Sequence, residues 1–134
     1  KLNSTAFRDV SFKDSKMLGL AFDSCNDVGL SFRFENCILN NSIFYKLSLR
    51  KTVFKDCILH EADFSETDLR NATFLNSDLS GATFDRTNLE QTDFRTAYNF
   101  AFNPENNKMK GAKFSASNLS GLLLHHNIVI DKNA

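Results

Sequence analysis

The fold of this chain is decided by a pattern that is clearest in residues 62–81, which read ADFSE-TDLRN-ATFLN-SDLSG. Each five-residue unit has a large apolar residue at its centre and a small residue two places earlier. The spacing extends in both directions, and Phe alternates with Leu at every central site. The central sites are Phe34, Leu39, Phe44, Leu49, Phe54, Leu59, Phe64, Leu69, Phe74, Leu79, Phe84, Leu89 and Phe94. A repeat this regular sets the architecture before any other feature is considered.

A period of five residues fits neither an α-helix nor a β-strand. Apolar faces recur about every 3.6 residues in a helix and about every 2.0 in a strand. A unit with two inward positions instead indicates a chain that turns a corner in each unit and stacks coil on coil, at about 4.8 Å per coil. The chain is therefore predicted to be a solenoid, in which no unit buries its apolar side chain without its neighbours.

The alternation of Phe and Leu predicts the size of each coil. Four units per coil place residues twenty apart above one another, so like side chains stack and every layer keeps the same width. Three units per coil would set Phe over Leu and lose this match. The predicted buried columns are Phe34, Phe54, Phe74, Phe94 and Phe114; opposite them Phe44, Phe64 and Phe84; then Leu39, Leu59, Leu79 and Leu119; and Leu49, Leu69 and Leu89.

The units at 62–66, 67–71 and 77–81 resemble the pentapeptide-repeat family, whose unit is roughly Ala-Asp/Asn-Leu-x-x. The resemblance covers nearly the whole chain. It implies an all-β fold, a right-handed quadrilateral β-helix, and this agrees with four units per coil. We expect one domain, 1–134, with about six coils and a short C-terminal helix and strand cap.

Breaks in the spacing divide this domain into five segments. Residues 1–24 keep the five-residue step in a different phase, because two residues are inserted at 25–29, where Asn, Asp and Gly favour a turn. The insertion is interpreted as a tolerated bulge or, alternatively, as a projecting binding loop. Regular coils are predicted over 30–98, an irregular loop with the single Pro over 99–111, and the last coil and cap over 112–134.

The open end of a β-solenoid exposes unpaired N–H and C=O groups, so the C-terminal segment is expected to cover it. Ser117 is predicted to cap a short helix over 118–126, and the Ile-Val-Ile run at 128–130 has strand propensity. This segment resembles the C-terminal part of the quinolone-resistance Qnr proteins, where a helix and strand close the coil and form a head-to-head homodimer. A homodimer is predicted, with a monomer whose cap folds onto its own core as the alternative. The predicted interface residues are Leu122, Leu123, Leu124, Ile128, Val129 and Ile130.

Few residues suggest catalysis. The three His are His60, His125 and His126, and the chain has no HExxH motif, Gly-rich phosphate loop or nucleophile elbow. His60 follows an inward Leu and is predicted to face solvent, and the adjacent pair is interpreted as a solvated part of the cap rather than a metal site. We predict no catalytic residue, cofactor, metal site or membrane span.

Cys37 and Cys57 are twenty residues apart, which stacks them in adjacent coils. Their Cα spacing of about 4.8 Å would allow a disulfide, but parallel side chains suit the geometry of the bridge poorly. Two reduced core cysteines are therefore predicted, and this fits a cytoplasmic protein.

Acidic residues have two interpretations. Four Asp that precede a central residue are predicted to support turns through bonds to local backbone: Asp63, Asp68, Asp78 and Asp93. The chain has no formal net charge, but residues 1–60 carry +3, residues 61–95 carry −5 and residues 96–134 carry +2. The central acidic belt can attract a basic partner, although its charges spread over all four faces of the coil. The predicted partner-binding residues are Asp63, Glu66, Asp68, Asp85 and Glu90.

Two functions follow from these features. The first is a non-catalytic protein-binding scaffold. The second is implied by the resemblance to the Qnr proteins: a rod of duplex-like width and negative charge that imitates DNA and binds DNA gyrase or topoisomerase IV. The acidic belt favours the second function, and the zero net charge and small insertion favour the first. Direct nucleic-acid binding is not expected, because the chain is not uniformly basic.

Overall fold

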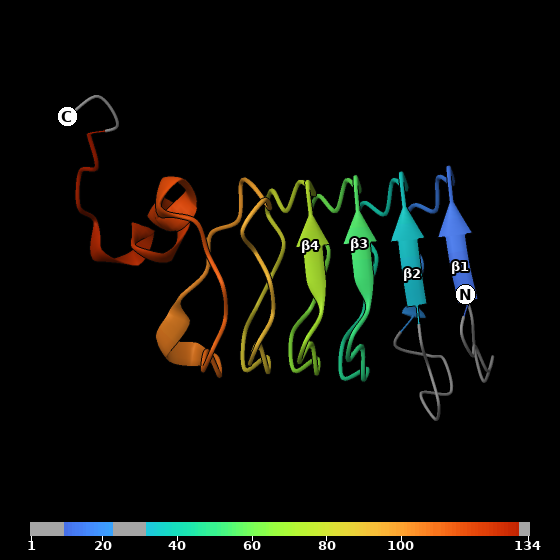
Figure 1. Cartoon of the computed structure of the whole chain (residues 1–134), viewed down its shortest axis with the longest axis horizontal. Coiled ribbons are helices and arrows are strands. Elements are labelled where there is room, and N and C mark those ends of the chain that lie inside the picture. The colour runs from blue at the N-terminus through green and yellow to red at the C-terminus, as the bar shows by residue number, and fades with distance from the viewer. Residues whose placement is uncertain (1–9, 23–31, 132–134) are drawn as a thin grey trace.

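In the computed structural model, which describes residues 10–22 and 32–131, the chain winds into a rod of stacked coils (Figure 1). One wall of the rod carries a parallel sheet in the order β1-β2-β3-β4. Its strands are β1 (Val10–Lys13), β2 (Phe32–Glu35), β3 (Val53–Lys55) and β4 (Thr73–Leu75). Elsewhere the coils are joined by single parallel bridges, such as Ser48 to Asp68. A five-residue unit leaves room for only a short strand before the chain turns the next corner.

Strand register gives the size of each coil. Phe34 pairs with Phe54, so these coils are offset by twenty residues and each holds four units. The first coil differs, because Phe12 pairs with Phe34, an offset of 22 residues. The bridge formed by Ala21 keeps this larger offset, so the two extra residues follow Ala21. The insertion predicted at 25–29 lies outside the described residues.

The coil is a right-handed quadrilateral β-helix, the hand expected where parallel strands are joined by crossovers. We name its four walls by their central residues. The Phe34 wall holds the sheet, and the Leu39, Phe44 and Leu49 walls follow in chain order. In the regular coils, residues twenty apart occupy equivalent positions on one wall.

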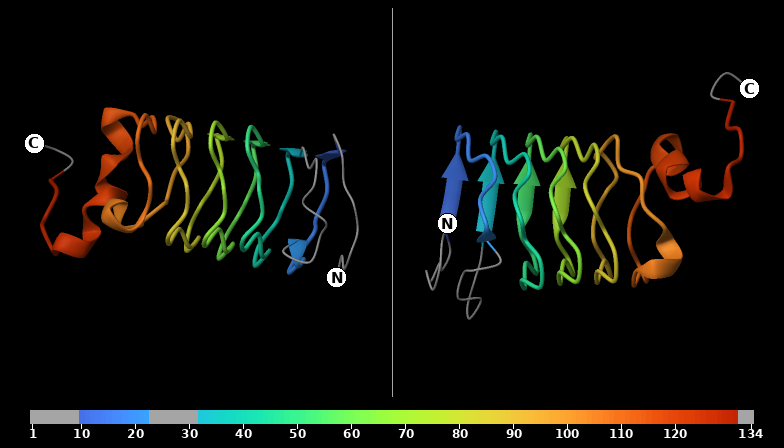
Figure 2. Two further views of the ribbon diagram at one scale, coloured as in Figure 1. Left: turned by 90° about the horizontal axis from the view of Figure 1, so that it is seen from below. Right: turned by 180° about the vertical axis from the view of Figure 1, so that it is seen from behind.

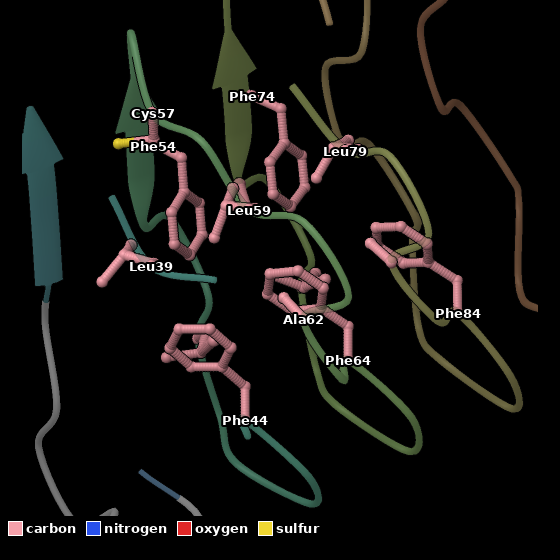
Figure 3. Packing of buried hydrophobic residues seen from close by; sticks show 14 of the residues in the cluster. Leu39, Phe44, Phe54, Cys57, Leu59, Ala62, Phe64, Phe74, Leu79 and Phe84 are labelled. Atoms are coloured by element: carbon pink, nitrogen blue, oxygen red, sulfur yellow. The ribbon is translucent and has the colours of Figure 1, made fainter. Parts of the chain in front are cut away.

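Aromatic rings fill the core in two continuous columns (Figure 3). In the predicted column from Phe34 to Phe114, successive ring centroids lie 4.9–5.2 Å apart. Phe12 extends this column, with its ring stacked 5.3 Å from that of Phe34. In the other column the Phe44 and Phe64 rings stack at 4.9 Å, and Phe44 meets Phe34 edge to face at 6.3 Å. Both predicted Phe columns are confirmed, except that Phe114, at the end of the first, is only partly buried.

Leucines occupy the remaining two sides of the core. Every predicted central Leu as far as Leu89 is buried, and the partly buried Met109 packs against the core at the next site of the Leu49 column. The prediction for Leu119 is wrong, because its side chain is 42% exposed. The chain enters a helix at Ala116 instead of completing another coil, so Leu119 never reaches the Leu39 column.

Corners of the coil are made by residues with positive φ at the last position of most units, such as Glu66 (φ 52°) and Asn71 (φ 61°). An Asp earlier in the unit supports the turn: the Ser65 N–H donates to Asp63 Oδ1 at 2.8 Å. The same bond, from the N–H two residues later, is accepted by Asp68, Asp78 and Asp93. The predicted turn role of these four residues is confirmed.

Small buried residues tie successive coils together. The hydroxyl two places before a central site donates to the carbonyl 23 residues earlier, as in Thr67 Oγ1 to Phe44 O (2.9 Å) and Thr87 Oγ1 to Phe64 O (2.7 Å). The same bond is made by Ser77 and Thr92. We call these bonds rungs. The small residues therefore satisfy buried carbonyls in addition to fitting the corner.

The five-residue pattern breaks beyond residue 98. Phe100 and Phe102, which are out of phase, fill the core in place of the missing central residues and are 5% and 9% exposed. A short 3-10 helix, η2 (Pro104–Asn106), follows. Parallel bridges return at Lys108, inside the range 99–111 that the sequence predicts as irregular.

The C-terminal cap consists of two short 3-10 helices, η3 (Ala116–Leu122) and η4 (Leu124–His126). Helix η3 begins after Ser115 rather than after the predicted cap Ser117, and Asn118 Oδ1 accepts the Ser115 N–H at 3.1 Å. Residues 128–130 are irregular despite their strand propensity, because they form no backbone bridge with any described residue. None of the helices in the described ranges is long and apolar enough to cross a membrane.

Candidate interaction surfaces

Exposed apolar side chains gather at the C-terminal end of the rod. Of the nine large apolar side chains exposed in the described part of the chain, six lie within residues 119–130. Val129 is 95% exposed and Leu124 is 56% exposed. In Figures 1 and 2 the stretch that follows η4 stands away from the last coil, whereas η3 lies against it. The cap therefore covers the end of the coil incompletely and leaves an apolar patch.

Five of the six residues predicted to form a dimer interface contribute to this patch. They are Leu123, Leu124, Ile128, Val129 and Ile130. Leu122 differs, because it is partly buried and packs against the core. Hollows beside Ile130 are lined by Leu119 and Leu123 in one case and by Tyr98 and Leu124 in the other. Tyr98 is 47% exposed, so the patch continues onto the Leu39 wall.

Gly121 fixes the orientation of the cap. A Cβ at this position would collide with the Phe100 carbonyl oxygen, so only Gly allows the close approach of these two segments of the chain. The Phe102 N–H donates to Gly121 O at 3.1 Å. Asn118 Nδ2 donates to Phe94 O at 2.8 Å and to a second carbonyl oxygen at 3.0 Å. These contacts decide which apolar residues face the core and which remain outside.

The five acidic residues predicted to bind a partner lie on two adjacent walls. Asp63, Glu66 and Asp85 belong to the Phe44 wall, and Asp68 and Glu90 belong to the Leu49 wall. The bond from the Glu66 N–H to Asp85 O (2.9 Å) places these two residues in neighbouring coils. These five residues therefore form two short clusters on either side of one corner, while the other acidic residues of the belt lie on the remaining walls.

Arginines of the chain itself pair with three of these carboxylates. Arg70 contacts both oxygens of Asp68, at 2.9 Å from Nε and 2.7 Å from Nη2. Partial burial opposes ionisation of Asp68, but hydrogen bonds from Arg70 outweigh it and hold the pKa below its usual value. Arg86 lies 3.6 Å from Glu66 and 3.5 Å from Asp85. These arginines partly neutralise the negative charge of the predicted binding residues, which weakens the attraction for a basic partner.

The two walls differ in formal charge. The Phe44 wall comprises units 42–46, 62–66, 82–86 and 102–106. The Leu49 wall comprises units 47–51, 67–71, 87–91 and 107–111. The first carries four acidic and two basic residues, and the second carries two acidic and five basic residues, hence −2 and +3. The basic wall was not predicted from the sequence, although the positions of Arg50, Arg70 and Lys110, which differ by multiples of twenty residues, indicate that these cations share one wall.

His60 faces outward on the Leu39 wall as predicted, and its Nε2 lies 2.7 Å from Asp78 Oδ2. Asp78 Oδ1 accepts from the Ser80 N–H and from Asn99 Nδ2, each at 3.1 Å. Partial burial opposes ionisation of Asp78, but these hydrogen bonds outweigh it and hold the pKa below its usual value. Asp78 therefore joins three successive coils. Within the described residues, no group of three or more His, Cys, Asp or Glu could hold a metal ion.

Cys37 and Cys57 are free, buried thiols. Cys57 Sγ lies 3.5 Å from Phe34 O and 3.3 Å from Lys55 O, so it occupies the rung position that Ser or Thr holds elsewhere. Burial raises the pKa of Cys57 to about 12. This thiol therefore stays protonated and acts as a core residue.

The repeat, the four-sided coil and its stacked columns define a class of protein, the pentapeptide solenoids. A family model described as "Pentapeptide repeat region" matches residues 30–98. The chain belongs to the pentapeptide-repeat family. None of the curated proteins matches it.

Several solved structures share this fold. HetL, involved in heterocyst differentiation regulation in the cyanobacterium Nostoc, is 23% identical, with a TM-score of 0.50, over 84% of this chain and 40% of its own. Trypsin-treated QnrB1, a plasmid-mediated fluoroquinolone resistance protein, is 24% identical, with a TM-score of 0.55, over 97% of this chain and 65% of its own. A protein from the Arabidopsis thaliana thylakoid lumen is 18% identical, with a TM-score of 0.53, over 72% and 69%. This chain spans less than two thirds of HetL and QnrB1, and the likeness establishes the fold alone.

Proposed function

We propose that this chain is a non-catalytic, protein-binding rod. The observation that carries the proposal is the apolar patch that the cap leaves outside, where Val129 is 95% exposed. Contiguous exposed apolar patches mark contacts between proteins. Core side chains fill the inward sites of the regular coils. A partner can therefore contact only the outward residues of the walls and the residues at the C-terminal end.

The partner that we propose for this end is a second copy of the chain, through residues 115–130. A two-fold contact uses the same patch on both chains and leaves no open end. Leu123, Leu124 and Val129 would be buried between the copies, and Leu122 would support them from the core side. The alternative is a monomer whose patch binds a different protein.

Sedimentation at micromolar concentration tests the dimer. Val129→Asp or Leu124→Asp should convert a dimer into a monomer, because each places a charge in the apolar contact. Leu18→Asp is a matched control, since Leu18 is 50% exposed on the first coil, far from the cap. A wild-type protein that sediments as a monomer would exclude the dimer and leave the monomer alternative.

A second candidate function is a DNA mimic that binds DNA gyrase or topoisomerase IV. It is supported by the acidic Phe44 wall and by the resemblance of the C-terminal segment to the Qnr proteins. Pairing of Arg86 with Glu66 and Asp85 counts against it, because it lowers the exposed negative charge. We therefore rank it second to the general binding rod.

A gyrase supercoiling assay with a quinolone tests this second candidate. Added protein should restore supercoiling in the presence of the drug, and Asp63→Asn with Asp85→Asn should reduce the effect. Asp14→Asn with Asp56→Asn, on the Phe34 wall, removes the same charge and should have no effect. An absence of protection at any protein concentration would exclude the DNA mimic.

We also propose a cytoplasmic location. Free, buried Cys37 and Cys57 suit a reducing compartment. When intact cells are denatured in the presence of an alkylating reagent, the reagent should label both residues. Mass spectrometry that finds them oxidised to a disulfide would contradict this location.

A further inference from the structure

The Leu49 wall presents its charges in fixed rows. The backbone bonds from Lys51 N–H to Arg70 O (3.0 Å) and from Gln91 N–H to Lys110 O (3.0 Å) stack the outward residues of successive coils. Glu90 stands between Arg70 and Lys110 in the same row. Because these residues belong to rigid coils with a buried core, their spacing along the rod is set by the fold.

Two pairs of cations on this wall can meet a partner, although the charge of Arg50 also acts on Asp68. Arg50 and Lys51 form the first pair, and Lys108 and Lys110 form the second; all four are exposed. None of the four takes part in an ion pair with another described residue. Arg70, between the pairs, is held by Asp68 instead.

The distance between the two pairs follows from the coil. Arg50 and Lys110 are separated by three coils, which corresponds to about 14 Å along the rod at about 4.8 Å per coil. In an extended peptide, residues four apart lie on the same face and are also about 14 Å apart, at about 3.4 Å per residue. An extended segment along the rod could therefore place acidic residues against both pairs.

We propose that the Leu49 wall binds an extended acidic segment of a partner protein, with its carboxylates grouped at a four-residue spacing. The inference goes beyond the proposed function, because it uses a wall of the rod and not its apolar end. A nucleic acid suits this wall less well. Duplex DNA carries a charge about every 1.7 Å, and its phosphates would meet Asp68 and Glu90 between the cations.

Fluorescence anisotropy with two synthetic peptides of equal composition tests the proposal. In one peptide two Glu-Glu pairs are separated by two Thr; in the other the four Glu are contiguous and the Thr flank them. We expect the spaced peptide to bind about tenfold more tightly at low salt. Its binding should weaken as salt rises towards physiological strength, because exposed charges are screened.

Variants of the wall sharpen the test. Lys108→Gln with Lys110→Gln should abolish the preference for the spaced peptide. Lys55→Gln with Arg95→Gln removes two cations from the Phe34 wall, where each is paired with an acidic residue, and should leave the preference intact. Circular dichroism checks that both variants keep the coil.

Three results would overturn the proposal. They are equal affinity for the two peptides, an equal loss of preference in both double variants, and tighter binding of a thymidine oligonucleotide of the same formal charge. Failure of the dimer or of the gyrase assay would leave this result untouched, since neither depends on the four cations. The proposed function and the binding of an acidic segment can therefore fail separately.

Discussion

The regular coils and the C-terminal end bury their apolar side chains by different rules. In the coils each ring rests on its equivalent twenty residues away, nearly parallel, as Phe54 does on Phe74 with an angle of 5°. At the end Phe102 reaches the core out of phase and lies at 46° to Phe84. Repetition therefore specifies the coil, whereas the end depends on a few unrepeated residues.

The rungs show the same contrast. In the coils hydroxyls bond the carbonyl 23 residues earlier, and Asn107 still keeps that spacing with Phe84 O at 3.1 Å. Asn118 bonds Phe94 O over a spacing of 24 residues. The spacing between donor and acceptor therefore increases by one residue at the point where the chain no longer follows the five-residue repeat. An amide reaches further than a hydroxyl, which suits Asn to this transition.

The largest expected effect comes from breaking a column. Phe64→Ala should cost about 3–5 kcal/mol of unfolding free energy, because neighbouring coils prevent the cavity from closing. Leu119→Ala, at the site where the sequence predicts another buried Leu, should cost less than about 1 kcal/mol because the side chain is exposed. Urea denaturation measures both. Equal losses would show that Leu119 is buried and that the coil continues through the cap.

Gly121→Ala should loosen the cap without breaking the coils. The new methyl group would collide with Phe100 O, at a cost of about 1–3 kcal/mol for overpacking. Amide exchange should accelerate at Phe102, whose N–H bonds Gly121 O, while the Phe64 amide stays protected. Ser120→Ala provides the neighbouring control. Unchanged protection of Phe102 would mean that Gly121 does not hold the cap.

Removing one rung should have a smaller effect. Thr67→Val keeps the shape of the side chain but leaves Phe44 O without its hydroxyl donor, for a loss of about 1 kcal/mol. Thr52 is the matched control, because its buried Oγ1 has no partner among the described residues. Thr52→Val should be neutral or slightly stabilising in thermal unfolding. Equal destabilisation of the two variants would show that the rung bonds do not stabilise the coil.

The smallest effect is a pH dependence. Hydrogen bonds from Arg95 hold the pKa of Asp93 below its usual value. A carboxyl with a lowered folded-state pKa stabilises the protein above its unfolded pKa, near 3.9, and this contribution is lost as pH falls through the folded value. Asp93→Asn and Arg95→Gln should both give a shallower fall of Tm below about pH 4 than the wild type. A steeper fall in either variant would contradict the assignment.

The candidate surfaces were only partly predictable. The sequence identified the apolar residues at 122–130 and the acidic residues at 61–95, because both follow from composition along the chain. It could not show that Arg70 and Arg86 would neutralise three of the predicted carboxylates, since two of these pairs depend on rotamers and the third joins neighbouring coils. It also gave Leu122 the same role as Val129, which the packing of the cap separates.

The sequence by itself determined the coil of this protein. A strict period of five and the alternation of Phe with Leu leave four units per turn as the arrangement that stacks like on like, so Phe34 must meet Phe54. Tertiary structure decided the end. Phe100, Phe102 and Gly121 have no repeat to place them, and their positions follow from filling the last layer and satisfying its backbone. The repeat can be recognised from the sequence one unit at a time. The packing of the last layer, by contrast, brings together residues that have no fixed spacing and that meet only in the folded chain.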